Sequence, residues 1–402
     1  MKTAIVIGAS SESVYAITVA QKRGYHVIAF DGNKEADGLS YADEPVVADI
    51  RDARCIWSRL AEKPDLILPV PIGRYLITTG AVNDYYGLKG LSEEAANYCT
   101  DKYLFHKRLS EQGLRDGICL LFEEGTSAAQ AAGLAIDALQ GAPMIMKPRY
   151  GSGNRGVMLV QSEEDIISYL GTGELTEDLV METVFTGKEY GIDAAVFDGR
   201  LFLFLIREKL LTPPPYRQCV GYLAVERKKE GVLYSRILEY LEQVVQILGL
   251  NHCLLHCDLM WDGNHPSLIE LSGRPSGHNL HNLFTPLATG INMVDSYISY
   301  VEGKAKDSLS FSVESEERRL LIGYFDSEPC RLDKVPDAST IKKIFGDSLL
   351  QYDCHLQPGI VQESKDGHTL MERGYFILSG KTREELLQSR KKLLEIVFEQ
   401  KG

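Results

Sequence analysis

A basic and glycine-rich stretch in the middle of the chain has the composition of a phosphate-binding loop. An apolar run ends at Lys147 and Pro148, and the segment that follows contains Gly151, Ser152, Gly153 and Gly156. Glycines let backbone amides approach an anion closely, and a lysine at the end of a strand would neutralise phosphate charge. A β-hairpin with a solvent-facing lysine has the same composition, so this motif alone leaves both interpretations open.

Two acidic residues lie on neighbouring predicted strands further along the chain. Asp258 lies in the apolar run at residues 254–260, and Glu270 in the run at 267–271. Apolar neighbours would bury both carboxylates, and buried carboxylates need a cation to compensate them. Oxygen ligands with substrate phosphates are what Mg²⁺ prefers, so the pair predicts a Mg²⁺ site, with Mn²⁺ as an alternative.

An arginine follows the second carboxylate closely. Arg274 comes four residues after Glu270, in a stretch where Gly273 and Gly277 would let the backbone approach a ligand. A guanidinium there could stabilise an oxyanion, which is the charge that develops in acyl transfer. The alternative is a surface ion pair between Arg274 and Glu270.

Four soft or borderline ligands near the first carboxylate invite a zinc interpretation: His252, Cys253, His256 and Cys257. A single strand cannot converge four ligands tetrahedrally, so a zinc site is disfavoured. Because strand residues alternate between faces, His256 shares a face with Asp258, and we expect His256 to line the cleft or to be a satisfied core histidine. Cys253 and Cys257 are expected to be packing thiols.

The first hundred residues predict a doubly wound parallel sheet. A strand at 3–7, a helix at 13–23 and a strand at 26–30 form a βαβ unit, and another strand follows at 65–70. The turn that begins at Gly8 lacks the further glycines of a dinucleotide fingerprint. Hydride transfer with a nicotinamide cofactor is therefore kept only as a rival.

The rest of the chain predicts mixed α+β structure. A charged helix is expected at 100–112, strands at 143–148, 179–182, 190–197 and 201–206, and a helix at 235–248. After Gly303 come a strand at 320–325 and a final helix from near Thr382, which we treat as a separate lobe after a linker at 304–307. The predicted domains are residues 1–98, 99–184, 185–304 and 305–402.

Composition narrows the classes of partner. The chain has 402 residues and a net charge of -13, so no broad basic face is available for nucleic acid. No stretch has the length and apolarity of a membrane-spanning helix. Eight scattered cysteines are typical of reduced thiols, which predicts a cytoplasmic protein. An anionic nucleotide would have to be bound by local lysines, arginines and backbone amides.

The order of these motifs resembles the ATP-grasp superfamily of carboxylate-amine ligases. Within it, Glu270, Arg274 and the Gly277-His278-Asn279 run, with Lys209 and residues 212–216, resemble the L-amino acid ligases that make dipeptides. The resemblance implies an α/β and α+β multidomain fold: an N-terminal pre-ATP-grasp domain, an ATP-grasp domain of two α+β subdomains (99–184, the lid, and 185–304) and a small C-terminal lobe.

The resemblance also implies a role for each matching residue. The lysines that would contact ATP phosphates are Lys102 and Lys147, under a covering loop of Gly151, Ser152, Gly153 and Gly156. The residues that would lie along adenine and ribose are Glu182, Thr183, Val184 and Glu189, for which structural acids are the alternative. The metal residues would be Asp258, Glu270 and Ser272, the last standing where many relatives have asparagine. The catalytic residues would be Arg274, Lys209 and Ser276.

The activity that the resemblance implies uses ATP and Mg²⁺ to convert a small-molecule carboxylate into an acyl phosphate, which an amine then attacks. Amino acids are the expected substrates and a homodimer the expected assembly. One departure is that Cys219 and Tyr222 stand where dipeptide ligases have glutamate and histidine, so the acid that binds the donor amine is missing. The rivals are acyl transfer to a carrier-protein thiol, a biotin-carboxylase-like activity and a noncatalytic ATP-binding protein.

Overall fold

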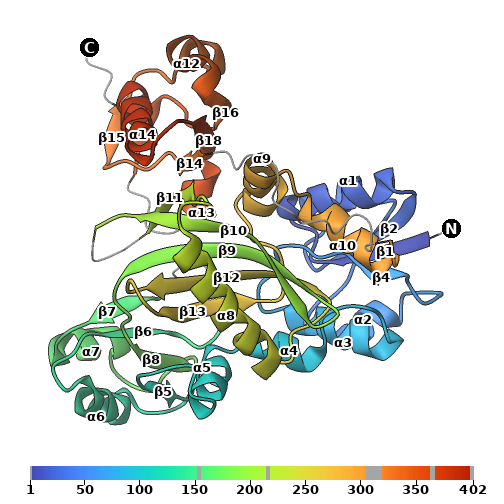
Figure 1. Ribbon diagram of the computed structural model, residues 1–402. Coiled ribbons are helices and arrows are strands. Elements are labelled where there is room, and N and C mark those ends of the chain that lie inside the picture. Colours follow the sequence, from blue (N-terminus) through green and yellow to red (C-terminus); the bar gives the residue numbers. More distant parts are fainter. Residues whose placement is uncertain (1, 152–154, 214–217, 305–318, 363–366, 399–402) are drawn as a thin grey trace.

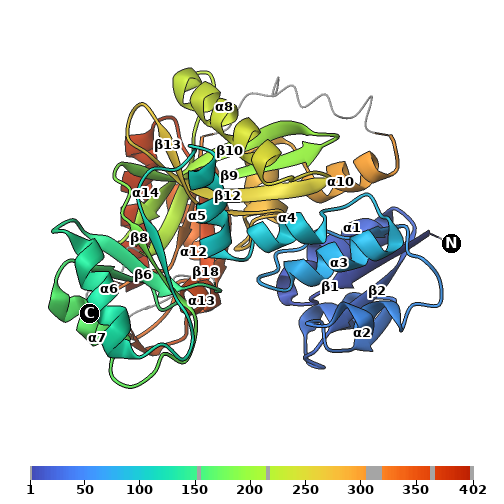
Figure 2. The ribbon, with the colours of Figure 1, turned by 90° about the horizontal axis from the view of Figure 1, so that it is seen from below.

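The computed structural model describes residues 2–151, 155–213, 218–304, 319–362 and 367–398. Three sheets with their helices make up most of the structure. Figures 1 and 2 show the N-terminal domain and the lid far apart at opposite ends of the view, both next to a large central sheet, with the C-terminal helices beyond one end of that sheet. No helix in the described ranges combines the length and the apolarity needed to cross a membrane.

The N-terminal domain is built on a parallel sheet whose strands run β3 (Glu44–Val47), β2 (Tyr25–Asp31), β1 (Lys2–Ile7) and β4 (Leu66–Ile67). Its helices are α1 (Val14–Lys22), α2 (Ala53–Trp57), α3 (Leu76–Tyr86) and α4 (Glu93–Tyr98), with short 3₁₀ turns η1 (Ser11–Ser13) and η2 (Asp37–Tyr41). Alternate residues of β1 enter two different hydrophobic clusters, Ala4 and Val6 in one and Ile5 and Ile7 in the other. The predicted doubly wound sheet is confirmed.

The lid is a separate antiparallel sheet with strands in the order β5 (Cys119–Phe122), β8 (Leu179–Thr183), β6 (Met144–Pro148) and β7 (Met158–Val160). The apolar sides of α6 (Ala128–Leu139) and α7 (Glu163–Leu170) pack on it. Helix α5 (Lys102–Glu111) leads into the lid, and the Asp101 side chain caps it by accepting from the Leu104 amide.

The central sheet has eight strands: β13 (Pro266–Ser272), β12 (Cys253–Trp261), β9 (Lys188–Phe197), β10 (Arg200–Leu211), β11 (Cys219–Ala224), β14 (Leu320–Tyr324), β18 (Gly374–Ser379) and β16 (Leu349–Cys354). All neighbouring pairs are antiparallel. Helix α8 (Gly231–Ile247) covers one face, where Ile237 and Leu241 pack against Ile192 and Leu255. The next residues along each strand point to the opposite face, which is where polar side chains collect.

Three further elements follow the central strands: the π-helical turn η3 (Leu280–Phe284), α9 (Thr285–Thr289) and α10 (Met293–Val301). The C-terminal region adds β15 (Cys330–Leu332), β17 (Gly359–Val361), α12 (Ala338–Phe345), η4 (Gly346–Ser348), α13 (Gly367–Glu372) and α14 (Arg383–Phe398). Its strands β14, β18 and β16 continue the central sheet, so the C-terminal lobe shares hydrogen bonds with the domain before it. The four domain limits stay predictions.

Two strands differ from their predicted lengths. The parallel strand expected at 65–70 pairs only at Leu66 and Ile67. Pro69 and Pro71 lack the amide hydrogen that a longer ladder needs, so the chain leaves the sheet early. Strand β10 instead runs on to Leu211, which carries Lys209 out along the polar face of the central sheet.

Candidate functional site

Polar side chains from two neighbouring strands face the same side of the central sheet. In the β12–β13 ladder Asp258 is opposite Glu270, and His256 is opposite Ser272. Directly opposed residues of an antiparallel pair share a face, so Asp258 and Glu270 lie on the same face of the sheet, and the prediction that they face one cleft stays a prediction. The expectation that both are buried is wrong for Glu270, which is exposed because β13 is the edge strand, whereas Asp258 is buried.

A cavity of about 480 Å³ lies over this edge of the sheet, bounded by the N-terminal domain, the start of α5 and the beginning of the glycine-rich segment. Five residues singled out from the sequence line it: Lys102, Gly151, Glu270, Ser272 and Arg274. His256 also lines the cavity, which agrees with the first of the two alternatives given for it from the sequence. These residues come from three parts of the chain, so tertiary folding alone brings them together.

Asp258 lies beside this cavity in contact with a lysine. Its Oδ2 is 2.7 Å from Lys209 Nζ, which also lies 2.6 Å from Glu189 Oε1. Burial would lower the pKa of Lys209, but the two carboxylates outweigh it and hold the pKa well above its usual value. Gly191 opposes Asp258 on β9, and a Cβ there would lie 3.3 Å from the carboxylate, so a glycine leaves the space that Asp258 occupies.

The carboxylates fit a divalent cation. Asp258 Oδ1 is buried without a hydrogen-bond partner in the described structure, and a buried oxygen of that kind calls for a ligand. Glu270 has no ion-pair partner among the described residues. No cluster of three or more His, Cys, Asp or Glu suited to a metal occurs in the described ranges. Two carboxylates with phosphate oxygens match Mg²⁺, which keeps few protein ligands.

Lys102 projects from the first turn of α5 toward the same cavity. Its Nζ donates to the Gly151 carbonyl at 2.8 Å. Burial lowers the pKa of Lys102, Glu270 opposes that shift, and Lys147 adds to it. Lys102 is therefore close enough to interact electrostatically with both Glu270 and Lys147.

Lys147 does not line the cavity and belongs to a buried group of charges between the lid sheet and α5. Its ammonium donates to Glu182, whose other oxygen lies 2.7 Å from His106 Nε2 and 3.4 Å from an Arg115 nitrogen. Burial would raise the pKa of Glu182, but these three side chains lower it well below its usual range. The phosphate contact of Lys147 and the adenine roles of Glu182, Thr183 and Val184 stay predictions.

His106 in this group predicts a pH dependence of stability. Burial lowers its pKa to about 4, although Glu182 opposes the shift, whereas an unfolded histidine titrates near ~6.5. Between these values only the unfolded chain takes up the proton, so the stabilisation is complete above ~6.5 and is lost as pH falls toward 4. We expect the His106→Gln variant to lack up to about 1.4 kcal/mol per pH unit of this slope. Urea unfolding of wild type and variant at four pH values would measure the slope. If the free energy of unfolding changed equally with pH in both proteins, the prediction would be contradicted.

Arg274 is held by backbone carbonyls. Its Nε donates to Ile72 at 3.0 Å and its Nη1 to Pro275 at 2.8 Å, and the described structure shows no ion pair with Glu270. The surface ion pair considered from the sequence is therefore absent in these ranges. A guanidinium carries five N–H groups, so further donors remain to face the cavity. Ser276 is fully buried and its hydroxyl has no described partner, and its catalytic role stays a prediction.

The loop after Arg274 takes a left-handed path, with φ of 60° at His278 and 61° at Asn279. The His278 amide donates to the Glu12 carboxylate, which comes from η1 in the N-terminal domain. A Cβ at Gly277 would lie 2.8 Å from that carboxylate, so a larger residue there would have to displace the Glu12 side chain. The turn after β1 thus holds the Arg274 loop through Glu12.

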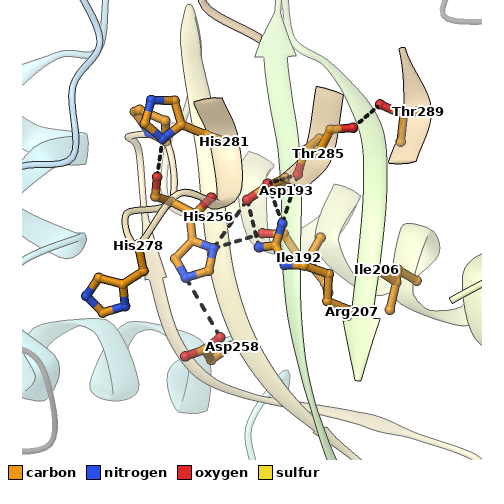
Figure 3. A network of polar contacts seen from close by, with 12 residues as sticks. Ile192, Asp193, Ile206, Arg207, His256, Asp258, His278, His281, Thr285 and Thr289 are labelled. Carbon is orange, nitrogen blue, oxygen red and sulfur yellow. Dashed lines mark hydrogen bonds and ion pairs between the residues drawn. The ribbon is translucent and has the colours of Figure 1, made fainter. Parts of the chain in front are cut away.

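Figure 3 shows a buried network on the same face of the central sheet, where Asp193 is opposite His256. Arg207 forms a two-point ion pair with Asp193, and the Thr285 hydroxyl donates to Asp193 at 2.6 Å. His256 lies between this pair and the site, with Nδ1 3.5 Å from Asp193 Oδ1 and Nε2 3.8 Å from Asp258 Oδ1. The contact with Asp193 holds the His256 ring in place beside Asp258.

Some sequence predictions concern residues away from this cavity. Ser152, Gly153 and residues 214–216 lie outside the described ranges, and Gly156 and Glu189 lie in the structure without lining the cavity. Cys253 and Cys257 are buried in the core under α8, which confirms them as packing thiols.

Sequence reasoning missed several residues that the fold places around the site. Those in buried charge groups are His106, Arg115, Asp193 and Arg207, and the one on the cavity wall is Arg74. A polar residue inside an apolar strand, such as Asp193 in β9, was a usable signal because an unpaired buried charge is costly. Arg74 had no such signal.

No family model matches the sequence. The arginine-specific carbamoyl phosphate synthase large chain of Geobacillus stearothermophilus is 24% identical over 302 residues, which cover 70% of this chain and 28% of that protein. The L-arginine-specific L-amino acid ligase of Bacillus subtilis is 23% identical over 326 residues, 78% of this chain and 75% of that one. This chain thus spans little more than a quarter of the first relative.

Among solved structures, an L-amino acid ligase from Bacillus licheniformis superimposes with a TM-score of 0.76 at 18% identity, covering 98% of this chain and 97% of that chain. The fold is therefore shared over almost the whole length. Together with the two sequence matches, it shows that this chain has the ATP-grasp fold, which it shares with this L-amino acid ligase structure.

Proposed function

We propose that this protein is an ATP-dependent carboxylate-amine ligase that forms an amide bond, with amino acids among its substrates. The observation that carries the proposal is the single cavity in which Lys102, Glu270, Ser272 and Arg274 meet. A carboxylate does not react with an amine directly because its leaving group would be oxide. Conversion to an acyl phosphate provides a good leaving group, and this step requires ATP.

Asp258 and Glu270 would hold the cation, with the Ser272 hydroxyl as an additional weak ligand. A cation held there would supply positive charge to neutralise the phosphates of ATP. Lys209, 2.7 Å from Asp258, keeps that carboxylate ionised, since burial alone would raise its pKa and Lys209 lowers it. Lys102 adds positive charge on the other wall of the cavity.

Arg274 would bind the carboxylate oxygen during phosphoryl transfer and the oxyanion when the amine attacks. Its two bonds to backbone carbonyls fix the guanidinium before substrate arrives, which is the condition for strong electrostatic stabilisation. Attack forms the C–N bond and breaks the bond between the acyl carbon and the phosphate oxygen, so phosphate leaves with that electron pair, and the proton of the amine nitrogen passes to the phosphate or to water.

The amine site departs from the dipeptide-ligase pattern. Tyr222 is opposite Lys209 in the β10–β11 ladder, and burial raises the pKa of Tyr222 well above its usual value, so it stays neutral. Cys219 is also protonated, because burial raises its pKa. Neither side chain would attract an ammonium group, which supports an acid substrate whose amine is absent, acylated or placed elsewhere.

A panel of carboxylic acids and amines, scored for phosphate release that needs both members of a pair, tests the proposal. The expected result is ADP and phosphate in equal amounts with an amide product of the matching mass. Phosphate release with an acid and a carrier-protein thiol but no amine would favour thioester formation instead. Release that depends on bicarbonate would favour carboxylation, and ATP binding without turnover for any pair would contradict the ligase proposal.

A further inference from the structure

Arg74 is an unassigned cation on the wall of the proposed active site. It lies between β4 and α3, at the carboxyl end of a parallel strand, where ligands of such sheets bind. Its side chain is exposed, and its guanidinium carbon lies 5.9 Å from the centre of the Tyr150 ring. Within the described ranges no carboxylate is in ion-pair contact with it.

The segment that carries Arg74 is hydrogen-bonded to Arg274. The Ile72 carbonyl, two residues before Arg74, accepts the hydrogen bond from Arg274 Nε at 3.0 Å. Ile72, Arg74 and Arg274 all line the same cavity. A molecule held by Arg274 therefore extends into a space that Arg74 also borders.

The charge balance of the cavity leaves Arg74 without a role in the proposed reaction. Its described lining contains four cations (Arg74, Lys102, Arg155 and Arg274) and one carboxylate, Glu270. Lys102 is assigned to nucleotide phosphate and Arg274 to the reacting carboxyl, and Arg155 belongs to the glycine-rich segment. In a protein of net charge -13, an extra exposed cation on this wall implies an anionic group to meet it.

We propose that Arg74 binds a second carboxylate of the substrates, one that does not react. This inference rests on the proposed ligase function. The carboxylate could belong to a dicarboxylic acid that is activated at its other end, or to an amino acid that serves as the amine. Both sources present the same planar anion, which a guanidinium binds through two parallel hydrogen bonds.

The test compares matched probes in wild type, Arg74→Ala and Arg74→Lys. Calorimetry measures binding of glutarate against its monoamide, and of alanine against alaninamide, and steady-state kinetics measures KM for the same probes in any pair that turns over. We expect wild type to prefer the carboxylate member of one pair by about 10- to 100-fold, Arg74→Ala to lose the preference with kcat and the KM for ATP nearly unchanged, and Arg74→Lys to restore part of it.

Arg59→Ala is the matched control, because Arg59 is an exposed arginine of the same domain whose side chain has only the Cys55 carbonyl as a hydrogen-bond partner in the described structure. It should keep the preference. Equal preferences in Arg74→Ala and wild type for both pairs, or a raised KM for ATP in Arg74→Ala, would overturn the inference. Arg74-dependent binding without any turnover would support this inference and contradict the ligase proposal. Turnover that does not depend on Arg74 would support the ligase proposal and contradict this inference.

Discussion

Replacing Arg274 with alanine is expected to lower kcat by about 10²- to 10³-fold, because one preorganised donor to a developing oxyanion contributes that much in comparable sites. The KM for ATP should change little, since Lys102 and the metal carboxylates remain. Arg274→Lys keeps the charge but loses the planar fork, so an intermediate kcat is expected. Steady-state kinetics with the best pair from the substrate panel would measure both variants.

Arg236→Ala provides the control for this experiment. Arg236 is an exposed arginine of α8 whose described ion pair is with Glu239 at 3.4 Å, so its loss removes the same charge far from the cavity. Melting temperatures of the three variants should stay close to that of wild type. A kcat for Arg274→Ala within threefold of the control would refute the role given to Arg274.

The second large effect concerns stability. Asp193 and Arg207 are both fully buried, so Asp193→Ala would leave a guanidinium without its partner inside the protein. Removing one member of a buried pair typically costs about 3–5 kcal/mol. Asp198, in the turn that directly follows β9, is 68% exposed, and Asp198→Ala should cost under about 1 kcal/mol.

Urea unfolding followed by fluorescence and circular dichroism would compare the two variants. The double variant Asp193→Leu with Arg207→Met should recover much of the loss, because apolar residues of similar volume can replace a buried pair. Equal midpoints for Asp193→Ala and Asp198→Ala would show that the network contributes little. Activity of the double variant would separately report whether the network holds His256 in place.

The carboxylate edge of the site could be predicted from the sequence because its information is local. The apolar alternation around Asp258 and Glu270 fixes the face on which each lies, and a short turn between the two runs makes them neighbours. Lys102 was found from its motif at the start of a helix that the structure confirms. The doubly wound N-terminal sheet followed from the same kind of periodicity.

Other parts depend on contacts between distant segments, which periodicity does not encode. The bond from Arg274 to Ile72 joins residues 202 positions apart, so nothing near Arg74 indicated that it would border the cavity. The burial of Glu182 with His106 and Arg115 likewise needs α5 and the lid to pack together. Strand β14 was predicted, but its pairing with β11 could not be, because the residue pattern of a strand does not specify which strand it will join.

That last pairing has a consequence for how the protein forms on the ribosome. Synthesis runs from the N-terminus, so β11 is complete well before β14 has been made, and until then β11 is the outer strand of the growing sheet. An outer strand offers unsatisfied amides and carbonyls to any neighbouring chain. The nascent protein is therefore open to wrong association at this edge until β14 has been made, and the pairing of β14 with β11 then satisfies these groups.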